Sequence, residues 1–384
     1  MHPLYQQMPT SIFEKMSLAA MEHGAVNLGQ GFPDFGWPQA ILDVAAEALL
    51  SQSNQYAPSR GLPVLRQAVA DHYNRHHSLV LLPEQVCITA GATEAIAAAI
   101  FATIAPGDEV ILFTPAYDAY APLIRRAGGV VREVALQSPA WRIDGAVLRE
   151  AITGKTRAIV INNPHNPTGR LFDRSELEAV AAVAVDHDLI VISDEVWEHL
   201  LLDGQQFTAM ASLPAMADRT IKCGSAGKIF SLTGWKVGWL VASPALATLA
   251  ARAHQFLTFS SPPNLQEAVA FGLNEGDDWL GPMRQSFAAA RDRMAGALRA
   301  IGYCVQDSAA TYFHCVDLEA SGIRADDRTF ADRAVVEAGI AVVPLSAFAE
   351  IDPPRGFIRL CFAKRDSTID AGVAALERAA RLFR

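Results

Sequence analysis

The sequence predicts an α/β protein, with a large domain built on a mostly parallel sheet covered by helices and a smaller α+β domain. Its 384 residues, 51% of them hydrophobic, suffice for one large core and a second, smaller one. From about residue 41 to residue 272, short β-branched runs alternate with helical stretches, which is typical of parallel strands with helices on both faces. In the last third, helical segments are mixed with short strand-like runs.

The predicted strands and helices follow one another in pairs. In the large domain, "VCIT" precedes "EAIAAAIFATI", "EVILF" precedes "YDAYAPLIRRAG", "AIVIN" precedes "SELEAVAAVAVDHD", and "LIVIS" precedes "EVWEHLL". In the small domain, the helical segments "PMRQSFAAARDRMAGALRAIG" and "TFADRAVVEAG" accompany the strands "YFHCVDL", "IAVVPL" and "FIRLCF". We expect residues 41–275 to form the large domain, residues 276–384 the small domain, and residues 1–40 an arm that packs partly on the latter.

Composition narrows the class of function. A formal charge of -9 without basic runs argues against nucleic acid or an anionic membrane as a partner, because both bind clustered lysine and arginine. Five cysteines without CxxC spacing suit neither a disulfide framework nor a zinc site, and the N-terminus resembles no secretory signal. We expect a cytoplasmic protein with reduced thiols and small-molecule partners.

The lysines are unevenly placed. Only six occur among 32 basic residues, and three of them lie in "KCGSAGKIFSLTGWKVGW", at Lys222, Lys228 and Lys236. Lysine can lose its proton and attack a carbonyl, whereas arginine stays charged, so this stretch is a candidate for Schiff-base chemistry. The glycine spacing excludes a nucleotide P-loop. This pattern gives no role to Lys222.

Several polar motifs follow predicted strands, and each has a plainer interpretation. Gly91, Ala92 and Thr93 could bind phosphate at a helix start or simply cap that helix. Asp194 could meet a ligand at the sheet edge or cap a helix, and Asn162 and Asn166 could bind a ligand or shape a turn. Because all these strands end at one edge of a parallel sheet, a shared site is favoured.

Two further features have open interpretations. Arg359 interrupts an apolar strand, so its guanidinium needs either an internal carboxylate or the carboxylate of a substrate. His72, His76 and His77 include an i, i+4 pair that could bind a metal. A solvated helix face is the favoured interpretation of these histidines, and we predict no metal site.

Eight motifs in order resemble the fold-type I aminotransferases of class I/II, which use pyridoxal 5'-phosphate (PLP). They are "VNLGQGFPDF", "QYAPSRGLPVLRQAV", "TAGATEA", "PAYDAY", "NNPHNPTG", "ISDEVWEHL", "GSAGKIFSLTGWKVGW" and "GFIRLCFAK". The likeness is greatest to methionine aminotransferases and kynurenine/glutamine transaminases, and it covers nearly the whole chain.

The resemblance implies a role for each motif. Lys228 forms the Schiff base with PLP, while Asp194 pairs with the ring nitrogen and Asn166 with the phenolic oxygen. The other residues implied to bind the cofactor are Gly91, Ala92, Thr93, Ser225 and Lys236 at the phosphate, Tyr117 stacked on the ring, and Tyr56 from the partner subunit of a homodimer. The residues implied to bind substrate are Phe13, Gly31, Asn162, Arg359 and, from the other subunit, Phe259.

One position departs from the family. Tyrosine usually stands three residues after the ring aspartate, but this chain has Trp197, whose indole N–H can donate a hydrogen bond and cannot ionise. We expect Trp197 to contact the cofactor and activity to be retained with an altered pH profile.

The expected reaction is amino transfer from methionine, an aromatic amino acid, glutamine or kynurenine to a 2-oxo acid in ping-pong half-reactions. Lys228 would move the proton at the substrate's Cα, with Asp194 keeping the ring nitrogen protonated. The alternatives are a cysteine-conjugate β-lyase on the same fold and a non-catalytic PLP-binding regulator. The regulator would need a DNA-binding domain, of which the sequence carries no sign.

Overall fold

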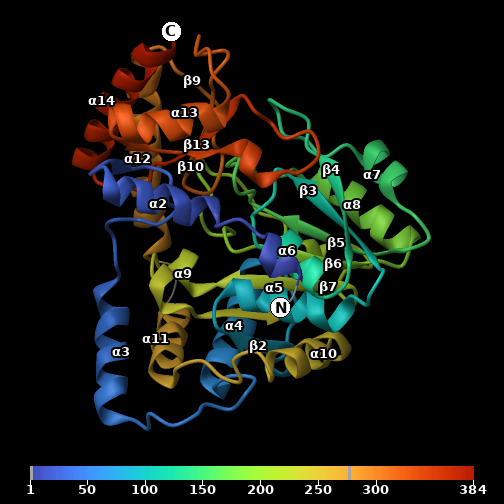
Figure 1. Ribbon diagram of the computed structural model, residues 1–384. Helices are drawn as coiled ribbons and strands as arrows, with labels where there is room; N and C mark the ends of the chain where they lie inside the picture. The colour runs from blue at the N-terminus through green and yellow to red at the C-terminus, as the bar shows by residue number, and fades with distance from the viewer. Residues whose placement is uncertain (1–2, 276–277) are drawn as a thin grey trace.

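The computed structural model describes residues 3–275 and 278–384 (Figure 1). A seven-stranded sheet forms its centre, in the order β2-β8-β7-β6-β5-β3-β4. Its strands are β2 (Val86–Thr89), β3 (Glu109–Thr114), β4 (Val130–Ala135), β5 (Thr156–Asn162), β6 (Ile190–Asp194), β7 (Thr220–Ser225) and β8 (Gly238–Val241). Strands β3 to β7 pair in parallel, whereas β8 is antiparallel to both β2 and β7.

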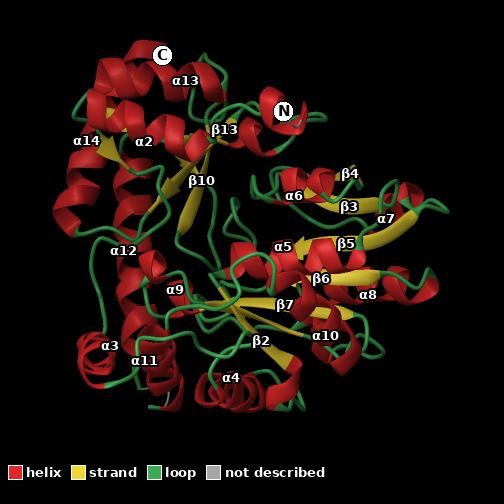
Figure 2. Ribbon diagram, turned by 60° about the horizontal axis from the view of Figure 1, so that its bottom comes forward, coloured by secondary structure: helices red, strands yellow, loops and turns green. Residues whose placement is uncertain are grey.

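Helices cover both faces of this sheet, as its alternating side chains require. Val110 and Leu112 face one apolar cluster, while Ile111 and Phe113 between them face another. The helices of the first cluster are α5 (Ala92–Thr103), α6 (Tyr120–Arg126) and α10 (Pro244–His254), and those of the second are α7 (Gly145–Ala151) and α8 (Arg174–Asp186). Helices α3 (Gln39–Ser51), α4 (Pro63–His76) and α11 (Pro263–Asn274) pack on the β2 and β8 end of the sheet. Figure 2 shows the strands side by side between these helices.

A four-stranded sheet, in the order β12-β13-β10-β9, lies in a second core. Its strands are β9 (Cys304–Val305), β10 (Phe313–Asp317), β12 (Val343–Pro344) and β13 (Phe357–Cys361), and its helices are α12 (Leu280–Ala300), α13 (Asp327–Arg333) and α14 (Asp366–Phe383). Helix α2 (Ile12–Glu22) and strand β1 (Val26–Asn27) join this core, where β1 pairs with β11 (Ile340–Ala341). The blue α2 lies among the orange and red C-terminal elements in Figure 1, and the short α1 (Pro3–Gln7) precedes it.

One predicted helix is absent. The stretch "EVWEHLL" after β6 forms consecutive turns. The Asp194 carboxylate accepts a hydrogen bond from the Val196 N–H, and the Asp194 carbonyl accepts from the Asn163 N–H and the Asn162 amide. These bonds replace those of a helix, because a short polar side chain competes for nearby backbone groups.

The histidines of α4 are also not where we expected them. His72 and His77 are buried, so the prediction of a solvated helix face was wrong. The helix packs this face against the turn that follows β6, where His199 lies 2.7 Å from His72 between Nε2 atoms. Within the described ranges, no helix combines the length and hydropathy needed to cross a bilayer.

Candidate active site

The carboxyl ends of β5, β6 and β7 meet the start of α5 around one cavity of about 230 Å³. Of the residues predicted to hold a cofactor, all but Tyr56 line this cavity: Gly91, Ala92, Thr93, Tyr117, Asn166, Asp194, Trp197, Ser225, Lys228 and Lys236. Asn162 lines it as well. The structure therefore brings together motifs that are up to 145 positions apart in the chain, as the strand-end argument requires.

The start of α5 forms a cradle. Gly91 has φ 79°, a conformation that favours glycine, and a Cβ there would lie 3.2 Å from Lys236 Nζ. A Cβ on Gly238 would come within 2.5 Å of the Gly91 carbonyl carbon. With both side chains absent, the first N–H groups of a twelve-residue helix face the cavity next to an ammonium group, which suits a phosphate.

Asp194 is buried at the end of β6 without an ion-pair partner among the described residues. The Tyr120 hydroxyl donates to its carboxylate at 2.5 Å, and the Val196 N–H donates at 3.3 Å. Burial raises the pKa of Asp194 to about 6 despite these two bonds. A carboxylate so placed favours a positively charged group in the cavity.

Lys228 follows β7 on the short helix α9 (Ala226–Ile229). Its amine donates to the Tyr312 hydroxyl at 3.2 Å, and that hydroxyl donates to the Gly31 carbonyl at 2.6 Å. Desolvation by burial lowers the pKa of Lys228 to about 8. The amine is thus oriented by two bonds in series and is easily deprotonated, as a nucleophile must be.

Trp197 is buried and lines the cavity. Its ring centre lies 4.6 Å from Lys228 Nζ and 4.6 Å from the Tyr312 ring centre, at 90° to that ring. The indole therefore faces the amine whose chemistry it was expected to influence.

Arg359 lies on β13 of the four-stranded sheet and contacts Asn166, which lines the cavity. Its guanidinium donates to Asn166 Oδ1 at 2.7 Å and to the Gly29 carbonyl at 2.6 Å, while Nε has no hydrogen-bond partner among the described residues. Within 3–275 and 278–384 no carboxylate forms an ion pair with it. The internal salt bridge, one of the two interpretations that the sequence left open, is therefore not formed among the described residues, and the burial of Arg359 calls for an external anion.

The remaining predicted site residues separate into three kinds. Phe13 lies beside the site, with its ring centre 4.9 Å from the Arg359 guanidinium carbon. Tyr56 and Phe259 are exposed and contact each other, with ring centres 5.6 Å apart. Asn162 donates to the Asp194 carbonyl and accepts from the Asn166 N–H. These bonds favour a role for Asn162 in shaping the turn, rather than the expected contact with the substrate's carboxylate.

Sequence reasoning missed three residues at or beneath this site. Tyr120 and Tyr312 hold Asp194 and Lys228, and Lys222 forms buried ion pairs with Glu195 and Glu198 directly beneath the turn. Tyr120 stands inside the quoted motif "PAYDAY", so its hydroxyl was a visible signal. Lys222 was also a visible signal in the sequence, because a lysine in an apolar strand must be paired.

Comparisons with known proteins agree with this geometry. The model of the family "Aminotransferase class I and II" matches residues 23–376. A probable N-succinyldiaminopimelate aminotransferase from Mycobacterium tuberculosis is 41% identical over 382 residues, which cover 96% of this chain and 95% of the relative. The methionine aminotransferase of Escherichia coli is 37% identical over 377 residues, covering 98% and 97%.

Solved structures show the same fold. That of N-succinyldiaminopimelate aminotransferase from Mycobacterium tuberculosis superposes with a TM-score of 0.95 at 40% identity, over 99% of this chain and all of the other. That of YbdL from Escherichia coli, described with a methionine aminotransferase function, gives 0.94 at 36% identity, over 98% and 99%. Members of the family use PLP, and the cradle, the buried Asp194 and the deprotonatable Lys228 fit its phosphate, ring nitrogen and aldehyde. This chain belongs to the class I and II aminotransferases, the PLP-dependent transaminases of fold type I.

Proposed function

We propose that this aminotransferase takes its amino group from L-amino acids with sizeable apolar or aromatic side chains, with methionine as the leading donor and a 2-oxo acid as acceptor. The observation that carries the proposal is the setting of Arg359. Its guanidinium carbon lies 4.0 Å from the ring centre of Phe313, 4.9 Å from that of Phe13 and 5.9 Å from that of Phe348. Phe313 and Phe348 are buried whereas Phe13 is partly exposed, so a substrate carboxylate can take the guanidinium while an apolar side chain meets Phe13.

The chain's own groups account for the chemistry. When bound, PLP accepts the electrons of the substrate's Cα–H bond. Asp194 would pair with the cofactor's ring nitrogen, and Asn166, whose Oδ1 accepts a hydrogen bond from Arg359, would keep its Nδ2 for the phenolic oxygen. The free Lys228 amine would move a proton to and from the substrate's Cα. The Tyr312 hydroxyl keeps that amine in place, so no separate base is needed.

A homodimer is part of the proposal. Tyr56 is 84% exposed and Phe259 is 42% exposed, although both are aromatic and in contact. In a dimer these rings would reach the partner's site, where Tyr56 would meet the phosphate and Phe259 the side-chain pocket. We expect sedimentation to show a dimer, and we expect Tyr56→Ala to bind PLP more weakly than the unaltered protein. A monomer with unchanged affinity for PLP would contradict this part.

A second donor class has an observation of its own. A cavity of about 490 Å³ adjoins Tyr117 and Phe348, and its lining includes Lys15, Arg125 and Arg328. An N-succinylated diamino acid is long and carries further carboxylates, which such a cavity could accommodate. Lys15 and Arg125 are already paired with Asp332 and Glu350, so methionine remains the first choice.

A half-reaction screen tests the assignment. Amino acids are added singly to the PLP-loaded enzyme, without acceptor, and the visible absorbance of the cofactor–lysine linkage is followed. We expect methionine and aromatic amino acids to discharge it faster than aspartate, with N-succinyldiaminopimelate as the rival probe. Faster discharge by aspartate would contradict the proposal. Pyruvate and ammonia released from a cysteine conjugate without an acceptor would identify the β-lyase instead.

A further inference from the structure

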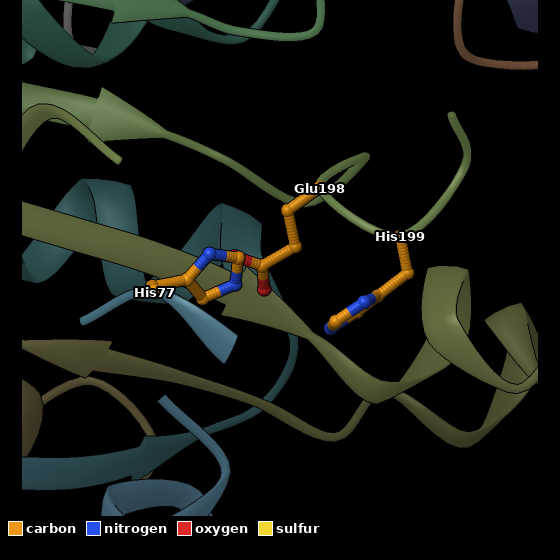
Figure 3. Close-up of side chains that lie close together, drawn as sticks. All are labelled: His77, Glu198 and His199. Carbon is orange, nitrogen blue, oxygen red and sulfur yellow. The ribbon is translucent and has the colours of Figure 1, made fainter. Parts of the chain in front are cut away.

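A group of histidines and glutamates lies behind the active-site turn, on the side away from the cavity. His72 of α4 and His77, which directly follows α4, face Glu198 and His199 of the turn, and Figure 3 shows His77, Glu198 and His199 converging. One ligand atom from each of these three lies within 4.8 Å of the others. All four residues are buried, and the proposed amino transfer uses none of them.

The imidazoles are left with unused nitrogen atoms. Among the described residues, His77 Nδ1 and His72 Nδ1 have no hydrogen-bond partner. His77 Nε2 approaches Glu198 Oε2 to 3.1 Å without the alignment of a hydrogen bond. Buried polar atoms are nearly always partnered, so several unpartnered nitrogens in one place point to a missing ligand.

Charge points to a cation. The two buried carboxylates of Glu195 and Glu198 face one ammonium, that of Lys222, and the imidazole of His77 lies 3.1 Å from Glu198, so a further positive charge would be well placed here. Neutral imidazoles are the form that binds metal ions.

The spacing of the rings suits a tetrahedral ion. With metal–nitrogen bonds of about 2.0–2.1 Å, two imidazoles on one tetrahedral ion have ring centres about 5 Å apart. The ring centre of His199 lies 4.8 Å from that of His72 and 5.8 Å from that of His77. His72 Nε2 and His199 Nε2 are 2.7 Å apart and share a hydrogen bond, so binding of one ion by both nitrogens requires that proton to leave and the rings to turn.

We propose that His77, Glu198 and His199, with His72 as a fourth donor, form a site for a divalent transition-metal ion such as Zn²⁺. Three nitrogens and one carboxylate oxygen are a donor set that zinc accepts. The ion joins the end of α4 to the turn that follows Asp194 and carries Trp197, so its role is structural, and the ammonium of Lys222 stays paired with Glu195.

The test uses tag-free, PLP-loaded enzyme stripped with a chelator and titrated with Co²⁺ alone. We expect one equivalent per chain, with the visible spectrum of tetrahedral Co²⁺, and displacement by Zn²⁺. His77→Gln and His199→Gln should each weaken binding by at least about tenfold. His187→Gln removes an exposed histidine and should bind as the parent does. Failure of the parent to bind stoichiometrically, or equal binding by all three variants, would overturn the proposal.

A second measurement covers the case in which the variants do not fold. Crystals of the unaltered holoenzyme are soaked in Zn²⁺, and anomalous diffraction is collected at the zinc edge. A peak between His77, Glu198 and His199 supports the site. If no peak appears there, the metal proposal is rejected.

Discussion

Replacing Lys222 by methionine removes an ammonium group and leaves two buried carboxylates facing each other. Glu195 keeps hydrogen bonds from the Ser193 hydroxyl and the Met210 N–H, whereas Glu198 keeps one from Tyr73. Breaking a buried ion pair by removing one partner costs about 3–5 kcal/mol of unfolding free energy. Because both carboxylates retain donors, we expect a loss at the lower end, about 3 kcal/mol at pH 8.

The loss should depend on pH with a definite sign. In the unaltered protein, burial alone would raise the pKa of Glu198, but Lys222 and His77 hold it well below its usual range. The stabilisation that the ionised Glu198 gives the folded protein is then complete above pH 4.5, the ordinary pKa of the group, and is lost only as the pH falls below that value. In Lys222→Met the unpaired carboxylates take up protons in the folded state, so stability rises as the pH falls, by up to about 1.4 kcal/mol per pH unit for each proton taken up.

The measurement is urea unfolding of PLP-saturated enzyme at fixed protein concentration, followed by circular dichroism at pH 8 and pH 6. Lys155→Met is the matched control, because Lys155 is exposed. The difference in unfolding free energy between Lys222→Met and Lys155→Met should shrink from pH 8 to pH 6. Adding Glu198→Gln to Lys222→Met should restore part of the lost stability. A difference below about 0.5 kcal/mol at both pH values would refute the reasoning.

Four further predictions concern the active site. The rate at which apoenzyme takes up PLP should rise with pH and level off above about 8, since only the neutral Lys228 amine attacks; a flat profile from pH 6 to 9 would contradict this. Asp194→Asn should lower kcat by about 10²-fold or more, measured at saturating donor, with the fold unchanged by circular dichroism. Arg359→Lys should raise KM for the donor about 10- to 100-fold, because one charge-assisted hydrogen bond is worth about 1.5–3 kcal/mol, and an unchanged KM would remove Arg359 from carboxylate binding. Trp197→Tyr should shift the pH profile of kcat/KM while activity persists, and identical profiles would show that the indole does not influence the reaction.

The large sheet and the position of the site were predictable because both follow from local rules. The expected strands "VCIT", "EVILF", "AIVIN" and "LIVIS" coincide with β2, β3, β5 and β6 to within one or two residues. Parallel strands must place their carboxyl ends at one edge, so Asp194, Asn166 and the glycine turn could be brought together without coordinates. The antiparallel β8 was not expected, since its pairing is non-local.

The turn after β6 could not be predicted from its periodicity. "EVWEHLL" has helical spacing of apolar and charged residues, but here the charged residues face inward. Glu195 and Glu198 are buried because Lys222, on the neighbouring strand β7, meets them from beneath. A pairing between residues 24 and 27 positions apart, across two strands, leaves no mark in the local pattern.

The histidines of α4 show the same limit. Their i, i+4 spacing is visible in the sequence. Whether that face meets solvent or protein depends on His199, which is 127 positions away from His72. Tyr312 is similar, since only the fold of the four-stranded sheet brings its hydroxyl to Lys228.

Arg359 belongs to a different sheet from Asp194 and the strand that leads to Lys228, and this division has an evolutionary consequence. Asp194 and Lys228, which are expected to act on the reacting atoms, are attached to the seven-stranded sheet, while Arg359, which is expected to hold the α-carboxylate, is attached to the four-stranded one. Substitutions deep in the second core that shift Arg359 would therefore change how tightly amino acid substrates are held, without altering Asp194 or Lys228. Substrate affinity can evolve in this way through packing, without exchange of a residue that touches the substrate.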